Sequence, residues 1–415
     1  MNALLRAHAD SIIQASIAAV QPEAAVVRAL KGVSFPGRVI LIAAGKAAWP
    51  MAQAAHQALG KAIEKGIVIT KYHHLKGPIG PLLLREAGHP LPDENSFSAT
   101  RKALSLVSGL TEQDTVLFLL SGGGSALFED PLIPGDMLQD ITGQLLACGA
   151  DIIEINTLRK RLSRVKGGRF AQACAPARVY SILLSDVLGD RLDMIASGPC
   201  APDPSTCGEA LAIAEKYQLR LTKEARTLLE RETPKSLFNV ESHITGSVRQ
   251  LCLAASQAAE KLGYQPILLT DQLCCQAREA GSFLSSILLT HKDAKKPLAF
   301  IAGGETVVQL RGKGKGGRNQ ELALSAAAGL AGQPHMALFS LGSDGTDGPT
   351  DAAGGYADGD TQATLTQAGW NIFDVLQEND AYHALKKTGG LILTGPTGTN
   401  VNDVAVGLIF PSLKP

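Results

Sequence analysis

Glycine-rich and basic residues between Gly303 and Glu321 form the stretch of this sequence best suited to chemistry. The stretch reads GGETVVQLRGKGKGGRNQE. It predicts a short strand over residues 306–310, a basic loop containing Gly316 and Gly317, and a helix beginning near Arg318. Such glycines let backbone N–H groups approach an oxyanion, and a helix start adds partial positive charge. The pattern predicts a phosphate site with Arg318 at its exit.

A second glycine loop follows the apolar run TVLFLL and reads SGGGSAL. It contains Ser121, Gly122, Gly123, Gly124 and Ser125. Successive glycines adopt backbone angles closed to other residues, so several N–H groups can converge on one anion. The alternative is a flexible turn. Because the loop ends a strongly apolar strand, we expect it to bind part of a cofactor.

Lys46 lies in AAGKAAWP, directly after the apolar run RVILIAA. The sequence has no GxxxxGK[ST] motif, so this is not a P-loop. A lysine at the end of a strand can still meet a phosphoryl oxygen as a point charge. The alternative is a solvated surface lysine.

Three aspartates occupy strand ends where they could bind Mg²⁺ or accept a proton. Asp186 ends a predicted strand, and Asp344 and Asp347 lie in the glycine-rich loop LGSDGTDGPTDAAGG. Mg²⁺ favours one or two carboxylates together with substrate phosphates. The alternative is an Asx-turn loop. Asn400, in TGPTGTNVND, adds a polar group at another glycine-rich strand exit.

Two other patterns are weaker. The basic segment NTLRKRLSRVKGGRFAQ is expected to be mostly a solvated helix face, with Lys166 or Arg169 as its candidates for the site. Gly312, Gly314 and Gly317 satisfy G-x-G-x-x-G, but a dinucleotide fold would place this motif in its first βαβ unit.

Short apolar runs alternate with helical segments along the chain, which predicts an α/β protein with parallel strands and helices on both faces. The polar segment 231–240 lacks periodicity and marks a boundary. We expect two α/β domains, over residues 1–235 and 236–415, with the site in the cleft between them. The predicted strands cover residues 38–44, 66–70, 115–120 and 179–187 in the first domain.

The composition argues against a nucleic-acid-binding, membrane-spanning or disulfide-stabilised protein. Lysine plus arginine equals aspartate plus glutamate, 39 each, so no overall field attracts nucleic acid or an anionic membrane. Seven irregularly spaced cysteines argue against a disulfide framework. The N-terminus reads as an amphipathic helix, and no apolar run approaches the roughly 20 residues of a membrane span. We expect a soluble, cytoplasmic protein; its oligomeric state, with a homodimer as one option, stays open.

Five motifs together resemble the type II glycerate 2-kinases over nearly the whole chain. They are INTLRKRLSRVKGGRFA, SDVLGDRLDMIASGP, GKGKGGRNQELAL, GSDGTDGPTDAAGG and GPTGTNVND. The resemblance implies a Rossmann-like glycerate-kinase N-terminal domain and a smaller C-terminal MOFRL domain. It also implies catalytic roles for Lys46, Arg318, Asp344 and Asn400. Ser343 stands where the family usually has threonine, which keeps a hydroxyl.

The activity implied by the resemblance is ATP-dependent phosphorylation of D-glycerate at the 2-hydroxyl, with a divalent metal such as Mg²⁺. Phosphoryl transfer also agrees with the residues themselves, because Lys46 and Arg318 supply positive charge and the aspartates could hold the metal or orient the hydroxyl. Some relatives are named hydroxypyruvate reductases, so an NAD(P)H-dependent reductase is the alternative. A non-catalytic module that senses a phosphorylated metabolite is a third.

Overall fold

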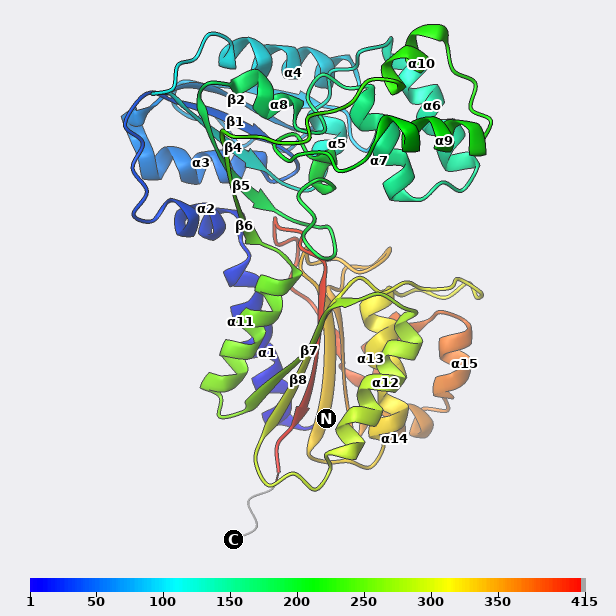
Figure 1. Cartoon of the computed structure of the whole chain (residues 1–415). Coiled ribbons are helices and arrows are strands. Elements are labelled where there is room, and N and C mark those ends of the chain that lie inside the picture. The colour runs from blue at the N-terminus through cyan, green and yellow to red at the C-terminus, as the bar shows by residue number, and fades with distance from the viewer. Residues whose placement is uncertain (412–415) are drawn as a thin grey trace. The chain divides into compact units, whose positions relative to one another are not determined.

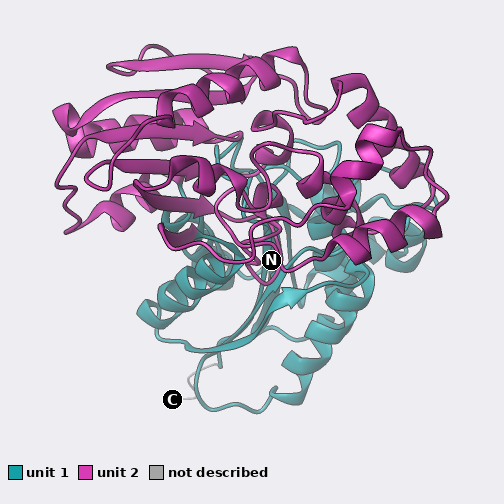
Figure 2. Ribbon diagram, turned by 45° about the horizontal axis from the view of Figure 1, so that its top comes forward, with its two compact units in different colours: residues 1–21, 246–415 teal, residues 22–245 magenta. Residues whose placement is uncertain are grey.

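The computed structural model of the protein describes residues 1–411 and divides into two compact units. Figure 1 shows the elements, and Figure 2 colours the units. Unit 2 comprises residues 22–245, and unit 1 comprises residues 1–21 together with residue 246 onward. The N-terminal helix therefore belongs with the second half of the chain, whereas the predicted ranges of 1–235 and 236–415 group it with the first.

Unit 2 contains a six-stranded sheet in the order β3-β2-β1-β4-β5-β6. The pairings of β1 with β2 and β4, of β2 with β3 and of β4 with β5 are all parallel. This order reverses between β1 and β4, which is the switch point where open α/β sheets bind ligands at the carboxyl ends of their strands. The strands are β1 (Val39–Ala44), β2 (Ile63–Lys71), β3 (Leu82–Ala87), β4 (Thr115–Leu120), β5 (Arg178–Leu184) and β6 (Val240–Gly246).

Alternate residues of β1 contribute to two separate cores. Ile40, Ile42 and Ala44 belong to one buried cluster, and Val39, Leu41 and Ala43 belong to the other. A strand buried on both faces needs a continuous apolar run, which is why RVILIAA identifies it. Helices α2 and α3 cover one face, and α4 and α8 the other (Figure 1).

The helices of unit 2 include a separate group, α6, α7, α9 and α10, with its own apolar core. The helical segments of the unit are α2 (Pro22–Leu30), α3 (Ala48–Leu59), η1 (Gly60–Ala62), α4 (Glu94–Val107), α5 (Gly124–Leu127), α6 (Gly135–Ala147), α7 (Ile152–Arg161), α8 (Arg169–Cys174), η2 (Ile195–Ser197), α9 (Cys207–Lys216) and α10 (Lys223–Leu229).

Unit 1 contains a mixed six-stranded sheet in the order β11-β10-β9-β12-β8-β7. Strand β12 is antiparallel to both β8 and β9, and only the pairing of β7 with β8 is parallel. The carboxyl ends of β8 and β9 therefore meet the start of β12 at one edge. The strands are β7 (Gln265–Leu273), β8 (Leu298–Gly304), β9 (Met336–Gly342), β10 (Gly354–Asp358), β11 (Leu391–Ile392) and β12 (Asp403–Ile409).

Helices cover both faces of this sheet. In Figure 1, α1 and α11 lie on one face, and α12 and α13 lie on the other. The helices are α1 (Ala3–Ala19), α11 (Val248–Lys261), α12 (Ala277–Thr290), α13 (Arg318–Leu330), α14 (Thr361–Gln367), α15 (Ile372–Gln377) and α16 (Ala381–Thr388). Within residues 1–411, no helix combines the length and the apolar character needed to cross a membrane.

The α/β class, the Rossmann-like sheet and the second α/β unit predicted from the sequence are confirmed. The strand predicted over residues 306–310 is wrong, because this segment makes only an isolated bridge at Val307. The basic loop is thus reached through irregular chain after Gly304, and the side chains of Val307 and Leu310 are exposed.

Candidate active site

The loop after β4 presents unused backbone donors at the switch point of the unit 2 sheet. The N–H groups of Gly122, Gly123 and Ser125 donate no hydrogen bond to any residue that the structure describes. Gly123 has a φ of 85°, in the left-handed region that favours glycine. The carbonyl of Ser125 accepts hydrogen bonds from Arg159 at 3.0 Å and from Lys166 at 2.8 Å, which anchors the far end of the loop. The geometry suits a bound anion.

Lys46 lies beside this loop. Its backbone N–H donates to the carbonyl of Gly122 at 2.9 Å, and the N–H of Ala47 donates to Oγ of Ser121 at 3.0 Å. A β-carbon on Gly45 would lie 2.2 Å from that same hydroxyl, so the close approach of the two strand ends requires glycine. The Lys46 side chain is half-buried, and within residues 1–411 its ammonium has no carboxylate partner.

Asp186 follows β5 and reaches the same loop. A β-carbon on Gly122 would lie 2.4 Å from its Oδ2, so the carboxylate lies against the Gly122 backbone. Asp186 is half-buried and already interacts with another group. Lys46, the loop 121–125 and Asp186 are therefore brought together, as their positions at successive strand ends predicted.

A backbone segment in an uncommon conformation supports the loop from behind. Ala196, Ser197 and Gly198 have φ values of 50°, 61° and 65° in succession. The Ser197 hydroxyl donates to Oδ1 of buried Asn156 at 2.8 Å. A β-carbon on Gly124 would lie 2.8 Å from that of Ala196. Non-glycine residues pay a cost for left-handed angles, and such costs concentrate at functional sites.

The basic segment 156–172 is not the solvated face that the sequence predicted. Lys160, Arg161 and Lys166 are all buried. Lys160 lies 3.1 Å from Asp203, and Lys166 lies 3.4 Å from Glu129. Burial lowers the pKa of the Lys166 ammonium to about 8, although Glu129 opposes that shift. These cations hold the fold together, because buried charges persist only when paired.

In unit 1, Arg318 is the first residue of α13 and is held by two carboxylates. Its Nε donates to Oδ2 of Asp403 at 2.5 Å, and its Nη2 donates to Oδ1 at 3.1 Å. Its Nη1 lies 3.0 Å from Glu305. The side chain remains about one-third exposed. A forked contact of this kind fixes the plane of the guanidinium.

Burial and pairing act in opposite directions on Asp403. Burial raises the pKa of its carboxyl to about 6, while the contact with Arg318 lowers it. Burial likewise lowers the pKa of Arg318, but the Asp403 hydrogen bond and charge raise it more, so the net shift is upward. Asp403 is 5% exposed. The arginine therefore stays charged, and the pairing offsets part of the cost of burying the Asp403 carboxylate.

Asp344 and Asn400 lie at the same edge of the sheet as Asp403. Asp403 pairs in register with Gly304 of β8 and with Gly342 of β9. A β-carbon on Gly342 would lie 3.3 Å from Oδ1 of Asp344 and 3.4 Å from Oδ1 of Asp403. Asp344 is half-buried, and its Oδ1 accepts the N–H of Thr346 at 2.9 Å. Oδ1 of Asn400 accepts the N–H of Asn402 at 3.3 Å.

Asp347, predicted as a metal ligand, caps α13. Its Oδ1 accepts the N–H of Asn319 at 3.1 Å, and its Oδ2 accepts the N–H of Gln320 at 2.9 Å. The side-chain amides of both residues add further bonds. Burial raises the pKa of this carboxyl. An internal carboxylate thus satisfies the start of the helix where the sequence pattern predicted a ligand anion.

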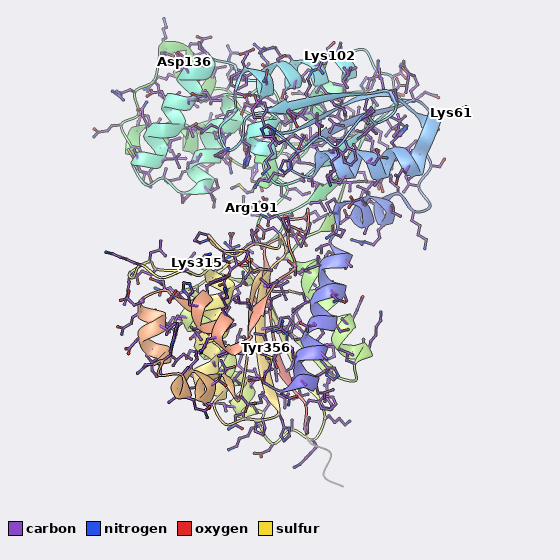
Figure 3. All side chains as sticks on the ribbon, turned by 180° about the vertical axis from the view of Figure 1, so that it is seen from behind. Lys61, Lys102, Asp136, Arg191, Lys315 and Tyr356 are labelled. Atoms are coloured by element: carbon purple, nitrogen blue, oxygen red, sulfur yellow. The ribbon has the colours of Figure 1, made fainter. Side chains whose placement is uncertain are left out.

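In the basic loop before α13, too, acceptors within the protein take the backbone N–H groups that were predicted to bind a phosphate. The N–H groups of Arg311 and Gly312 both donate to Oδ1 of Asn379, and that of Gly314 donates to the carbonyl of Glu378. The N–H of Lys315 donates to Asp380 at 2.9 Å. Four amides therefore bind residues 378–380 instead of a phosphate. Figure 3 labels Lys315, whose ammonium lies 4.5 Å from the centre of the Tyr382 ring.

Gly316 and Gly317 come after these four amides. Their N–H groups make no hydrogen bond to the residues that the structure describes. A β-carbon on Gly317 would lie 2.3 Å from Cγ of Asp347, so the cap requires glycine at this position. The sequence pattern assigns no role to Glu305, and it marks Asp403 only as one polar residue of the segment TGPTGTNVND. Their positions, directly after β8 and at the start of β12, are the signal that could have found them.

The described residues offer few carboxylates to a metal ion. Among residues 1–411, no group of three or more His, Cys, Asp and Glu side chains could hold a metal ion. Both Asp347 oxygens accept N–H donors, whereas Asp344 and Asp186 stay half-buried. Asp344 in unit 1 and Asp186 in unit 2 are therefore separate candidates, and a single carboxylate suffices for Mg²⁺ when substrate phosphates supply its other ligands.

Two family models match the chain. Residues 8–230 match a domain of unknown function, DUF4147, and residues 298–403 match the MOFRL family. The chain is 54% identical to the D-glycerate 2-kinase of Thermotoga maritima over 98% of each chain. It is 39% identical to the glycerate 2-kinase of Pyrococcus horikoshii over 96% of each.

A solved structure matches as well. The crystal structure of a glycerate kinase from Thermotoga maritima is 53% identical, has a TM-score of 0.94, and covers 98% of this chain and 99% of its own. This identity over the full length agrees with the five motifs and with the strand order of unit 2. The chain therefore belongs to the glycerate 2-kinase family that combines a DUF4147 domain with a MOFRL domain.

Proposed function

We propose that this protein phosphorylates D-glycerate at its 2-hydroxyl with ATP, giving 2-phospho-D-glycerate and ADP. The observation that carries the proposal is the half-buried, unpaired ammonium of Lys46 beside the unused amides of the loop 121–125. These donors lie at the switch point of the sheet, where a phosphorylated ligand is expected. Membership of the glycerate 2-kinase family supports the choice of substrate.

In unit 2, the loop 121–125 binds phosphoryl oxygens through its backbone, and Lys46 neutralises their charge. Phosphoryl transfer needs little covalent chemistry from the protein, so positioning and charge stabilisation supply most of the rate. The hydrogen bond from the Lys46 N–H to the Gly122 carbonyl fixes the position of Lys46 relative to the glycine loop. Asp186 lies against Gly122 and limits where the anion can rest.

In unit 1, Arg318 stabilises charge that develops on the transferring phosphoryl group. The fork to Asp403 and the contact with Glu305 hold the guanidinium before substrate arrives, so no reorganisation is needed during reaction. Asn400 orients a substrate oxygen from the adjacent turn. Gly316 and Gly317 add backbone donors beside Arg318. Each unit thus contributes its own set of residues to the proposed reaction.

Magnesium enters with ATP and supplies charge neutralisation at the phosphates. Asp344 is our first choice for its protein ligand, because its Oδ1 takes only the Thr346 N–H and its Oδ2 takes no hydrogen bond from any described residue. Asp186 is the second choice. Asp347 is better explained as the cap of α13 than as a ligand. We propose a cytoplasmic location for the reaction.

The reductase alternative depends on the G-x-G-x-x-G pattern at residues 312–317. The amides of Gly312 and Gly314 are bonded to residues 378–380, and this loop does not follow the first strand of the parallel sheet. In unit 2, the turn after β1 carries Lys46 instead of a glycine triplet. These features favour binding of ATP over binding of a nicotinamide dinucleotide.

One experiment separates the two activities. The purified protein is incubated with D-glycerate and Mg-ATP, and ADP release is followed by a coupled assay. A parallel reaction with hydroxypyruvate and NADH is followed at 340 nm. We expect ADP release that requires D-glycerate and no oxidation of NADH. NADH oxidation without ADP release would replace the kinase with the reductase.

A further inference from the structure

His89, in the turn after β3, lies at the anion site of unit 2. A β-carbon on Gly123 would lie 3.0 Å from Cδ2 and 3.1 Å from Nε2 of His89, and 3.1 Å from Cγ of Lys46. A side chain at position 123 would crowd both residues, so each lies close to the Gly123 backbone. The imidazole and the Lys46 side chain therefore both lie beside the glycine loop.

The His89 ring is available for a ligand. The residue is half-buried, and neither ring nitrogen is hydrogen-bonded to any residue in the described range 1–411. Two other histidines do have partners: His8 binds the Tyr264 hydroxyl, and His291 binds the carbonyl of Ile287. A partly buried imidazole without a partner, next to an anion site, has the accessibility that a catalytic base needs.

The chain around His89 is held firmly. Gly88, which follows β3, donates its N–H to Asp93. Asp93 also caps α4 through the N–H of Ser96 at 2.9 Å and accepts the Tyr72 hydroxyl at 2.6 Å. One carboxylate thus ties the turn that carries His89 to a helix and to the neighbouring strand end. A base positioned by rigid neighbours loses little entropy when it acts.

We propose that His89 is the general base of the phosphoryl transfer, a role that rests on the proposed kinase function. Nε2 takes the proton from the 2-hydroxyl of glycerate as that oxygen bonds to the γ-phosphorus of ATP. The bond from this phosphorus to the bridging oxygen breaks, and its electron pair leaves with ADP. The proton then rests on the imidazole until solvent removes it.

The electrostatic surroundings keep the imidazole neutral. Burial lowers the pKa of His89, and the charges of Lys46 and Lys71, from the ends of β1 and β2, lower it further. The carboxylate near this loop is Asp186, which lies against Gly122 and has its own partner. A neutral imidazole has a free lone pair that can accept a proton at pH 7.

The aspartates are weaker candidates for this role. Both oxygens of Asp347 accept amides at the start of α13. Asp403 is bound by both arms of the Arg318 fork. Asp344 has an oxygen to spare, but its exposure and position suit a metal ligand better. His89 alone of these groups combines unpaired nitrogens with a neutral form at pH 7.

The test is chemical rescue. His89→Ala should lose on the order of a hundredfold or more in kcat, the usual contribution of a general base, while the KM for ATP changes little. Added imidazole should restore part of the rate, and substituted imidazoles should restore it in order of their basicity. The matched control is His335→Ala, from the exposed segment before β9, which should lose little activity and gain nothing from imidazole.

His89→Gln serves as a second variant and keeps a polar side chain of similar reach. Its unfolding midpoint should equal that of the wild type, and its kcat should be as low as that of the alanine variant. A variant with more than one-third of the wild-type kcat, or an inactive but folded alanine variant that no imidazole rescues, would overturn the role of His89. Wild-type protein without glycerate-dependent ADP release would instead overturn the proposed function and this role with it.

Discussion

Arg318 and Asp403 form a forked ion pair, with Nε–Oδ2 and Nη2–Oδ1 distances of 2.5 and 3.1 Å. The first residue of α13 is thereby joined to the first residue of β12, 85 positions later in the chain. The pair presents a guanidinium of fixed orientation at the edge of the sheet that also carries Asp344. The proposed charge stabilisation depends on this relationship.

Arg318→Ala should cost on the order of 3 kcal/mol in transition-state stabilisation, roughly a hundredfold in kcat/KM, as expected for a lost charge-stabilising donor. Arg318→Lys should restore little, because an ammonium cannot make the fork to Asp403. Steady-state kinetics with D-glycerate and Mg-ATP measure both variants. A near-normal rate in the alanine variant would remove Arg318 from the reaction.

Asp403→Asn should lower kcat at least tenfold, because the buried partner that fixes the guanidinium loses its charge. Glu305→Gln is the matched control. It removes the charge of the second carboxylate that contacts Arg318, and this Glu305 side chain is 46% exposed. Exposed ion pairs contribute about 0–1 kcal/mol, so its effect should be no more than severalfold. Equal losses in the two variants would contradict the role given to the fork.

The glycine loop should not tolerate side chains. Gly122→Ala would place a methyl carbon 2.4 Å from Oδ2 of Asp186, and the resulting displacement should reduce activity on the order of a hundredfold. Gly143→Ala is the control, because its position in α6 has no atom within 4 Å of the new carbon. That change should raise stability by roughly 1 kcal/mol and leave the rate unchanged. An active Gly122→Ala enzyme would rule out a tight anion site here.

Asp344 and Asp347, three residues apart, should respond differently to the same substitution. Asp344→Asn should raise the Mg²⁺ concentration needed for half-maximal activity and leave the unfolding midpoint unchanged. Asp347→Asn should instead destabilise the fold by about 1 kcal/mol, as for loss of a helix cap, because it weakens the bonds to Asn319 and Gln320. Metal titrations and urea unfolding of both variants provide the comparison; a metal effect confined to Asp347→Asn would reverse these assignments.

Lys166 should make the free energy of unfolding depend on pH in the alkaline range. Its folded-state pKa is about 8 and its ordinary value is 10.5. Between these values the unfolded chain binds more protons than the folded one, so this group raises the unfolding free energy as pH increases from about 8 to 10.5. Relative to Lys166→Met, the wild type should therefore gain stability across this range.

Glu129→Gln provides a control for that titration. It removes the carboxylate that raises the pKa of Lys166, so the rise in stability should begin at a lower pH. Urea unfolding at pH values from 7 to 10.5 would show both effects. A constant difference between wild type and Lys166→Met across the range would mean that the buried ammonium does not titrate there.

The strands that position the site could be predicted because they are continuous apolar runs. RVILIAA, TVLFLL and VYSILL correspond to β1, β4 and β5, and each ends where a proposed site residue begins. Burial on both faces of a parallel sheet demands such runs. The positions of Lys46 and Ser121 at one edge follow from that topology alone.

Long-range partners could not be predicted. The basic segment 156–172 looked solvated, yet Lys160 pairs with Asp203 across 43 positions. The amides of the loop 311–315 looked available, but Asn379 and its neighbours accept them. His89 gave no signal, because a lone histidine in an irregular turn has neither periodicity nor a motif. Contacts between distant segments decided each of these outcomes.

The position of the transferred phosphate tests the central claim most directly. The product of D-glycerate and Mg-ATP would be examined by two-dimensional ³¹P–¹H correlation NMR, with authentic 2-phosphoglycerate and 3-phosphoglycerate as references. We predict coupling between the product phosphorus and the single proton on C2. Coupling to the two protons on C3, or an unchanged ATP spectrum while NADH and hydroxypyruvate are consumed, would contradict the assignment of this protein as a glycerate 2-kinase.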